Sequence, residues 1–153
     1  MGIFSKLFPT KPFFTQEEHS SIVKAIRAAE KRTSGEIRVF IESRCSYVDA
    51  VDRAAEIFFG LKMEHTEDRN GVLLYIALKD KQMAIFGDEG IHKKVGTAFW
   101  NKEVKKILSE FKQQHYATGI ITIIKEIGEA LLTHFPYENE DRNELPDDIV
   151  FGK

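Results

Sequence analysis

The chain has 153 residues, and 42% of them are hydrophobic, which suits one domain with a substantial core. Its formal net charge of −2 gives no electrostatic basis for binding nucleic acid, and Cys45 is the only cysteine, which excludes an internal disulfide and a thiolate metal site. Residues 1–9 lack the long apolar core of a secretory signal, and no apolar run approaches the roughly 20 residues that cross a bilayer. We therefore expect a cytoplasmic protein without a membrane span.

The first 14 residues combine four phenylalanines with two prolines. This composition favours a strap that packs on the domain, because so many aromatic side chains are costly to leave in water. An anchor for a protein partner or for a membrane surface is the alternative. The segment is too short to form a stable helix on its own, which weighs against that alternative.

A helix, a strand and a second helix are predicted next. Thr15 and Glu18 have the spacing of a capping box, and apolar residues then recur at helical spacing until about residues 33–35. Residues 36–42 alternate between polar and apolar, which predicts the first strand. Ser46 and Asp49 offer caps for the second helix, which should stop near residues 60–63. The side chains expected to be buried on that helix are Val51, Ala54, Ala55, Phe58 and Phe59.

The central feature of the sequence is a β-hairpin. Residues 72–78 are nearly all apolar, as in a strand covered on both faces, residues 79–81 form a polar turn, and residues 82–86 form the returning strand. A hairpin brings the start of its first strand beside the end of its second. Asp68 and Asn70 should therefore lie next to Asp88 and Glu89.

The C-terminal half is predicted to be helical, followed by a tail. We expect a short helix over 91–96, an amphipathic helix over 101–113, a break at 116–119 and a buried apolar helix over 120–132. Residues 137–148 hold six acidic residues and read as an extended tail, whose end at 149–151 could dock as a short strand or strap. This gives one domain over 15–136, between a strap at 1–14 and a tail at 137–153.

The direction of the first strand decides which further carboxylate joins the hairpin cluster. A strand–helix–strand unit usually leaves its two strands parallel, which places Glu36 beside Asp68 and Asp88. If the strands were antiparallel, Glu42 would take that place. We expect the parallel arrangement.

Carboxylates gathered in this way repel one another, and a hard divalent cation such as Ca²⁺ or Mg²⁺ removes the conflict. Asn70, Glu89 and backbone carbonyls could complete its coordination. Two alternatives need no metal: Asp68 and Asn70 bond their own turn, and Arg69 pairs with Asp88.

The five histidines show no zinc spacing. His92, four residues after Asp88, is either a general acid or an ordinary surface residue.

Four segments in the same order resemble the TPM domain. They are Thr33-Ser34-Gly35-Glu36-Ile37-Arg38-Val39, Asp68-Arg69-Asn70-Gly71-Val72-Leu73-Leu74, Gly87-Asp88-Glu89-Gly90-Ile91, and Thr118-Gly119-Ile120 with the apolar helix that follows. The resemblance covers about residues 14–136. Many members carry Gly-x-Gly-Leu-Glu in the third segment, where this chain differs.

The resemblance implies a three-layer α/β/α sandwich around a mixed β-sheet, with a Ca²⁺ or Mg²⁺ cleft at one sheet edge. Glu36, Asp68, Asn70 and Asp88 fall on matching positions. Some members of the thylakoid lumen are linked to photosystem II repair and described as acid phosphatases. We expect this chain to lack the signal peptide or membrane anchor of such members.

Two functions follow as hypotheses. In the first, the domain binds a cation and acts through a protein partner, as an interaction, assembly or stress-related module. In the second, it is a metal-dependent phosphatase in which Asp68 or Asp88 is catalytic. Only Arg69 is placed to hold a phosphate group, so the sequence favours the module.

Overall fold

The computed structural model describes residues 14–47, 49–137 and 149–152. Its elements are α2 (Gln16–Glu30), β2 (Glu36–Glu42), α3 (Ala50–Gly60), β3 (Gly71–Ala77), β4 (Gln82–Gly87), α4 (Glu89–Lys112), α5 (Tyr116–His134) and β5 (Val150–Phe151). No helix in the described ranges combines the length and hydrophobicity that crossing a membrane requires. Of the predicted N-terminal strap only Phe14 is described, and it is buried; residues 1–13 and 138–148 lie outside the described ranges.

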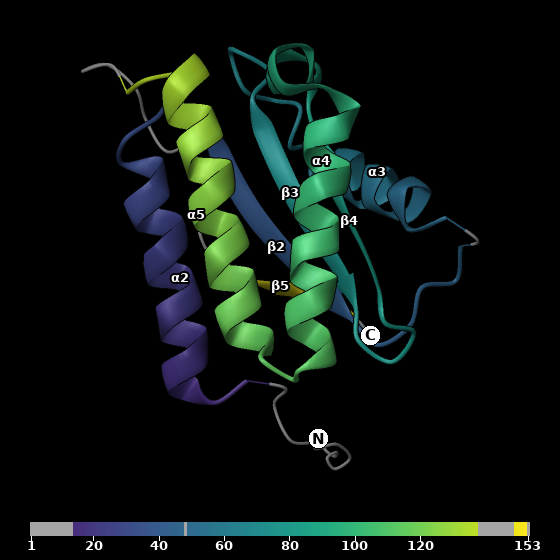
Figure 1. Ribbon diagram of the computed structural model, residues 1–153. Helices are drawn as coiled ribbons and strands as arrows, with labels where there is room; N and C mark the ends of the chain where they lie inside the picture. Colours follow the sequence, from purple (N-terminus) through teal and green to yellow (C-terminus); the bar gives the residue numbers. More distant parts are fainter. Residues whose placement is uncertain (1–13, 48, 138–148, 153) are drawn as a thin grey trace.

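Four strands form one mixed sheet in the order β4-β3-β2-β5 (Figure 1). β2 runs parallel to β3 and to β5, whereas β3 and β4 form the antiparallel hairpin. The predicted parallel pairing of the first two strands is confirmed, with Glu36 opposite Gly71. The end of the acidic tail supplies the edge strand, as Val150 and Phe151 pair with Phe40 and Ile41.

Helices cover both faces of the sheet, which confirms the α/β fold (Figure 1). Ile37, Val39 and Ile41 of β2 face α2, α4 and α5, together with alternate residues of β3. Phe40 of β2 belongs to a second cluster against α3, which also contains Tyr75. Because strand side chains alternate between faces, a continuous apolar run such as residues 72–77 fills two cores at once.

The first helix begins as predicted, since Thr15 and Glu18 form the capping box. The two helical pieces predicted after the hairpin are joined in α4, with a kink at Gly96, whose φ of 80° is outside the helical range. The break predicted at 116–119 is wrong. Those residues form the first turn of α5, and the chain turns earlier, where Gln114 takes a positive φ of 62°.

The burial expected on α3 is wrong at two positions. Val51 is 49% exposed and Phe59 is 46% exposed, while Ile57 is buried beside Phe58. The side chains at 54, 57, 58 and 61 form the stripe of α3 that packs on the sheet. Val51 lies outside this stripe and therefore points toward solvent. Phe59 keeps a partial contact by packing edge-on against Phe86.

Candidate functional site

Three chain segments meet where β2 and β3 begin and β4 ends. Glu36 N–H donates to the Asn70 carbonyl at 3.4 Å, and Asp88 N–H donates to the Gly71 carbonyl at 2.9 Å. Gly90 N–H donates to the Arg69 carbonyl at 2.8 Å, so the first turn of α4 is tied to the loop before β3. This edge is formed by residues 34–36, 64–70 and 87–90, and we call it the acidic edge.

Asp88 is the buried carboxylate of the acidic edge, with only 3% of its surface exposed. It caps α4, because its Oδ1 accepts from Glu89 N–H at 2.8 Å. Both of its oxygens also bind Arg69, through Nε at 2.7 Å and Nη2 at 2.9 Å. A bidentate guanidinium–carboxylate pair is the strongest form of this interaction, and the Asp88 carboxylate raises the pKa of Arg69. The metal-free pairing weighed from the sequence is therefore present.

The other predicted ligands are distributed around this pair. Asn70 is buried and donates from Nδ2 to Ser34 Oγ at 3.0 Å, while Ser34 reaches the exposed Asp68 at 3.4 Å. Glu36 is buried at the start of β2. Glu89 is exposed and lies 3.8 Å from Arg69 Nη1.

Two residues of the acidic edge were not anticipated from the sequence. Ser34 bridges Asn70 and Asp68, and its position directly before Gly35-Glu36 was the signal that could have indicated it. Glu64 acts electrostatically on Arg69, and its Oε1 is buried without a hydrogen-bond partner among the described residues. His92 lies nearby, where its Nδ1 accepts from Trp100 Nε1 at 3.0 Å, so that nitrogen carries a structural bond.

The positions of the carboxylates at the acidic edge decide whether they are grouped as ligands for a divalent cation. Within the described ranges, no three His, Cys, Asp or Glu side chains are grouped as ligands around one point. Arg69 instead supplies the positive charge, and the carboxylates of Asp88, Glu89 and Glu64 all act on it. Glu64 Oε1 has no hydrogen-bond partner among the described residues, so it is a polar atom at this edge that the described contacts leave unsatisfied. The described side chains therefore do not form a preassembled cation site, and Asp88 is paired with Arg69 instead.

A second charged network lies at the opposite edge of the sheet. Glu42, at the end of β2, accepts two hydrogen bonds of 2.9 Å from Arg53 of α3 and another from the Tyr75 hydroxyl. The Arg53 guanidinium lowers the pKa of Glu42, and burial together with Glu42 raises the pKa of Tyr75. Parallel pairing put Glu42 here rather than at the acidic edge, and its contacts attach α3 to the sheet.

The fold is an α/β/α sandwich with an acidic edge beside a strand–helix junction, and comparison with known proteins gives the family. The TPM domain model matches residues 10–130, so the chain belongs to the TPM domain family. The comparison with curated proteins finds no match.

Solved structures agree with this assignment. The BA42 protein from the psychrophilic bacterium Bizionia argentinensis is 44% identical, with a TM-score of 0.85 over 94% of this chain and 99% of that one. The N-terminal domain of the cg2496 protein from Corynebacterium glutamicum is 14% identical, with a TM-score of 0.60 over 81% and 86%. An N-terminal domain from P. gingivalis is 16% identical, with a TM-score of 0.63 over 82% and 83%. The last two show the fold alone.

Proposed function

We propose that this TPM domain binds a divalent cation, Ca²⁺ or Mg²⁺, at the acidic edge, and that the cation replaces the guanidinium of Arg69. The observation that supports the proposal is the burial and pairing of Asp88. This carboxylate is 3% exposed, and both of its oxygens accept hydrogen bonds from Arg69. A buried carboxylate requires a cationic partner. Arg69 is 38% exposed, so its side chain can return to water at a smaller cost than Asp88.

The surplus of negative charge supports replacement by a doubly charged ion. Asp88, Glu89 and Glu64 act on a single arginine, and Asp68 stands at the same edge. Asp88, Asp68 and Glu89 would hold the cation, with Asn70 and Glu36 beside them and Glu64 as an added candidate. When bound, the cation would supply a second positive charge to this set.

The proposed biological role is that of an interaction or assembly module. Replacement by the cation frees Arg69, which can then bind a carboxylate or phosphate group on a protein partner. Cation binding would thus control a contact without any change of fold. Hydrolysis of a phosphate ester by Asp68 or Asp88 is the competing activity, and it needs Arg69 to leave Asp88 and clamp the substrate.

Calcium and magnesium titrations of the isotope-labelled protein, followed by NMR, test the proposal. We expect shifts confined to residues 34–36, 64–70 and 87–92. Arg69→Gln should bind the cation about tenfold more tightly, because the competing internal cation is gone. Asp88→Asn should abolish binding.

Arg44→Gln is the matched control. Arg44 pairs with Asp80 at the other end of the sheet, and its substitution removes the same charge as Arg69→Gln. Equal affinities of the two arginine variants, or wild-type affinity in Asp88→Asn, would refute the exchange. Assays with p-nitrophenyl phosphate address the competing activity. Hydrolysis that persists in both Asp68→Asn and Asp88→Asn would exclude these carboxylates as its source.

A further inference from the structure

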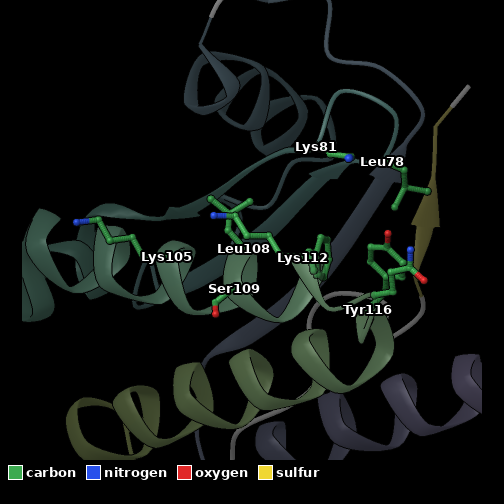
Figure 2. Close-up of a pocket in the computed structure, with 9 residues that line it drawn as sticks. Leu78, Lys81, Lys105, Leu108, Ser109, Lys112 and Tyr116 are labelled. Atoms are coloured by element: carbon green, nitrogen blue, oxygen red, sulfur yellow. The ribbon is translucent and has the colours of Figure 1, made fainter.

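A pocket of about 600 Å³ lies away from the acidic edge, at the end of the sheet where β3 turns into β4. Figure 2 shows side chains from three elements around it. They are Leu78 and Lys81 from the hairpin turn, Lys105, Leu108 and Lys112 from α4, and Tyr116 from the first turn of α5. The volume lies within the range of about 300–1,000 Å³ typical of small-molecule sites.

The floor of this pocket is apolar. Leu78, Leu108 and Phe111 line it, and Phe111 packs edge-on against Tyr116 with 4.8 Å between the ring centroids. Leu108 and Phe111 are only partly buried against the core, so the space in front of them is apolar surface left uncovered by the fold. A ligand that fills it gains by removing this surface from water.

The rim is basic. Lys105 and Lys112 lie three residues before and four residues after Leu108, so helical spacing puts both on the pocket side of α4. Lys81 approaches from the hairpin turn, where its φ of 52° is set by the turn. In the part of the chain that the structure describes, none of these three lysines forms an ion pair, and no aspartate or glutamate lines the pocket.

Two carboxylates that neighbour these lysines in the sequence make other contacts. Asp80, beside Lys81 in the turn, binds Arg44 at 3.0 Å and the Cys45 N–H at 2.8 Å. Glu110, between the α4 lysines in sequence, lies with one carboxylate oxygen 3.4 Å from His115 Nδ1. The positive charge of the rim is therefore not neutralised from within these elements, and it is available to an outside anion.

We propose that this pocket binds a small amphipathic carboxylate, whose apolar body covers Leu78, Leu108 and Phe111 and whose head is attracted by the positive charge of the rim lysines, Lys81, Lys105 and Lys112. The charge of the rim selects an anion, and the apolar floor selects a molecule with a hydrocarbon body. A bare anion would leave the apolar floor exposed to water. A neutral hydrocarbon would cover the floor but would not pair with the three lysines of the rim.

Decanoate, used well below the concentration at which it forms micelles, is the probe. Titration of the isotope-labelled full chain, followed by NMR, should shift the amides of residues 78–81, 105–116 and few others, with saturation. Decanol and inorganic phosphate provide the body and the charge separately. Each should bind at least about fivefold more weakly than decanoate.

The double variant Lys105→Gln/Lys112→Gln should raise the dissociation constant about three- to tenfold, the effect of losing two exposed ion pairs. Lys24→Gln/Lys93→Gln is the matched control, because both lysines are exposed and neither lines the pocket. It should change the constant less than about twofold. All four lysines are on the surface, so both variants are expected to fold.

Three results would overturn the proposal. They are shifts that do not saturate or that map to another face, an equal loss of affinity in the control double variant, and binding of decanol or of inorganic phosphate as tight as that of decanoate. The metal titration above reports on a different edge of the sheet, so the two proposals succeed or fail separately.

Discussion

Replacing Gly90 by alanine tests how closely α4 must approach the loop before β3. A Cβ atom built on Gly90 would lie 2.1 Å from the Asp68 carbonyl oxygen and 2.6 Å from that of Arg69. Real Cβ atoms essentially never come closer than 3.0 Å, so the loop must retreat by about 0.9 Å from Asp68 alone. Both obstacles are backbone atoms, which cannot be relieved by rotating a side chain.

The expected cost combines three contributions. Overpacking of this kind costs about 1–3 kcal/mol. The hydrogen bond from Gly90 N–H to the Arg69 carbonyl, now 2.8 Å, would be lost or stretched for about 1 kcal/mol more. Alanine is a better helix former than glycine by up to about 1 kcal/mol, which offsets part of the loss. We expect a net decrease of about 1–3 kcal/mol in the free energy of unfolding.

Urea unfolding followed by circular dichroism measures this quantity, and Gly60→Ala provides the control. A Cβ on Gly60, at the end of α3, meets no atom within 4 Å, so its substitution should leave the stability unchanged or slightly increased. Gly90→Ala should also weaken cation binding, because it separates Asp88 from the Asp68 loop. If Gly90→Ala is as stable as Gly60→Ala, the close approach described here is incorrect.

Two further predictions concern pH and charge. Burial, and then Glu126, raise the pKa of Glu103, so the wild-type protein should lose stability as the pH rises from the ordinary pKa of a glutamate through the raised pKa of Glu103. Glu103→Gln should remove that loss in thermal unfolding scans, and identical pH profiles for the two proteins would count against it. Arg53 lowers the pKa of Glu42, whose contribution is present above its unfolded pKa and disappears as the pH falls. Glu42→Gln should cost about 2–3 kcal/mol at neutral pH and little in acid, and a cost that does not vary with pH would contradict the ion-pair explanation.

The local elements could be derived from the sequence because their signals are local. Thr15 and Glu18 form the capping box that their spacing predicts, and residues 36–42 form the strand that their alternation predicts. The turn at 79–81 likewise follows from polar residues between two apolar runs. In each case a few neighbouring residues determine the hydrogen bonds involved.

Errors arose where a residue's neighbours come from a distant part of the chain. Val51 and Phe59 are apolar, but the rotation of α3 on the sheet decides which side of the helix is covered. The start of α5 depends on how its first turn packs against the end of α4, which Thr118 and Gly119 do not reveal. Such packing follows from the whole core rather than from any window of sequence.

The sequence alone predicted that Glu36, Asp68, Asn70, Asp88 and Glu89 would lie at one edge, with Glu42 in place of Glu36 had the first two strands been antiparallel. The observed parallel and hairpin pairing carries these strand ends there. Only the tertiary structure decided how their charge is balanced. In the structure, Arg69 binds Asp88, and Glu64 Oε1 has no hydrogen-bond partner among the described residues. At the other end of the sheet, three lysines line a pocket with an apolar floor. Strand pairing follows the chain's local pattern, whereas the partner of a charged side chain depends on distances between elements that no local pattern encodes.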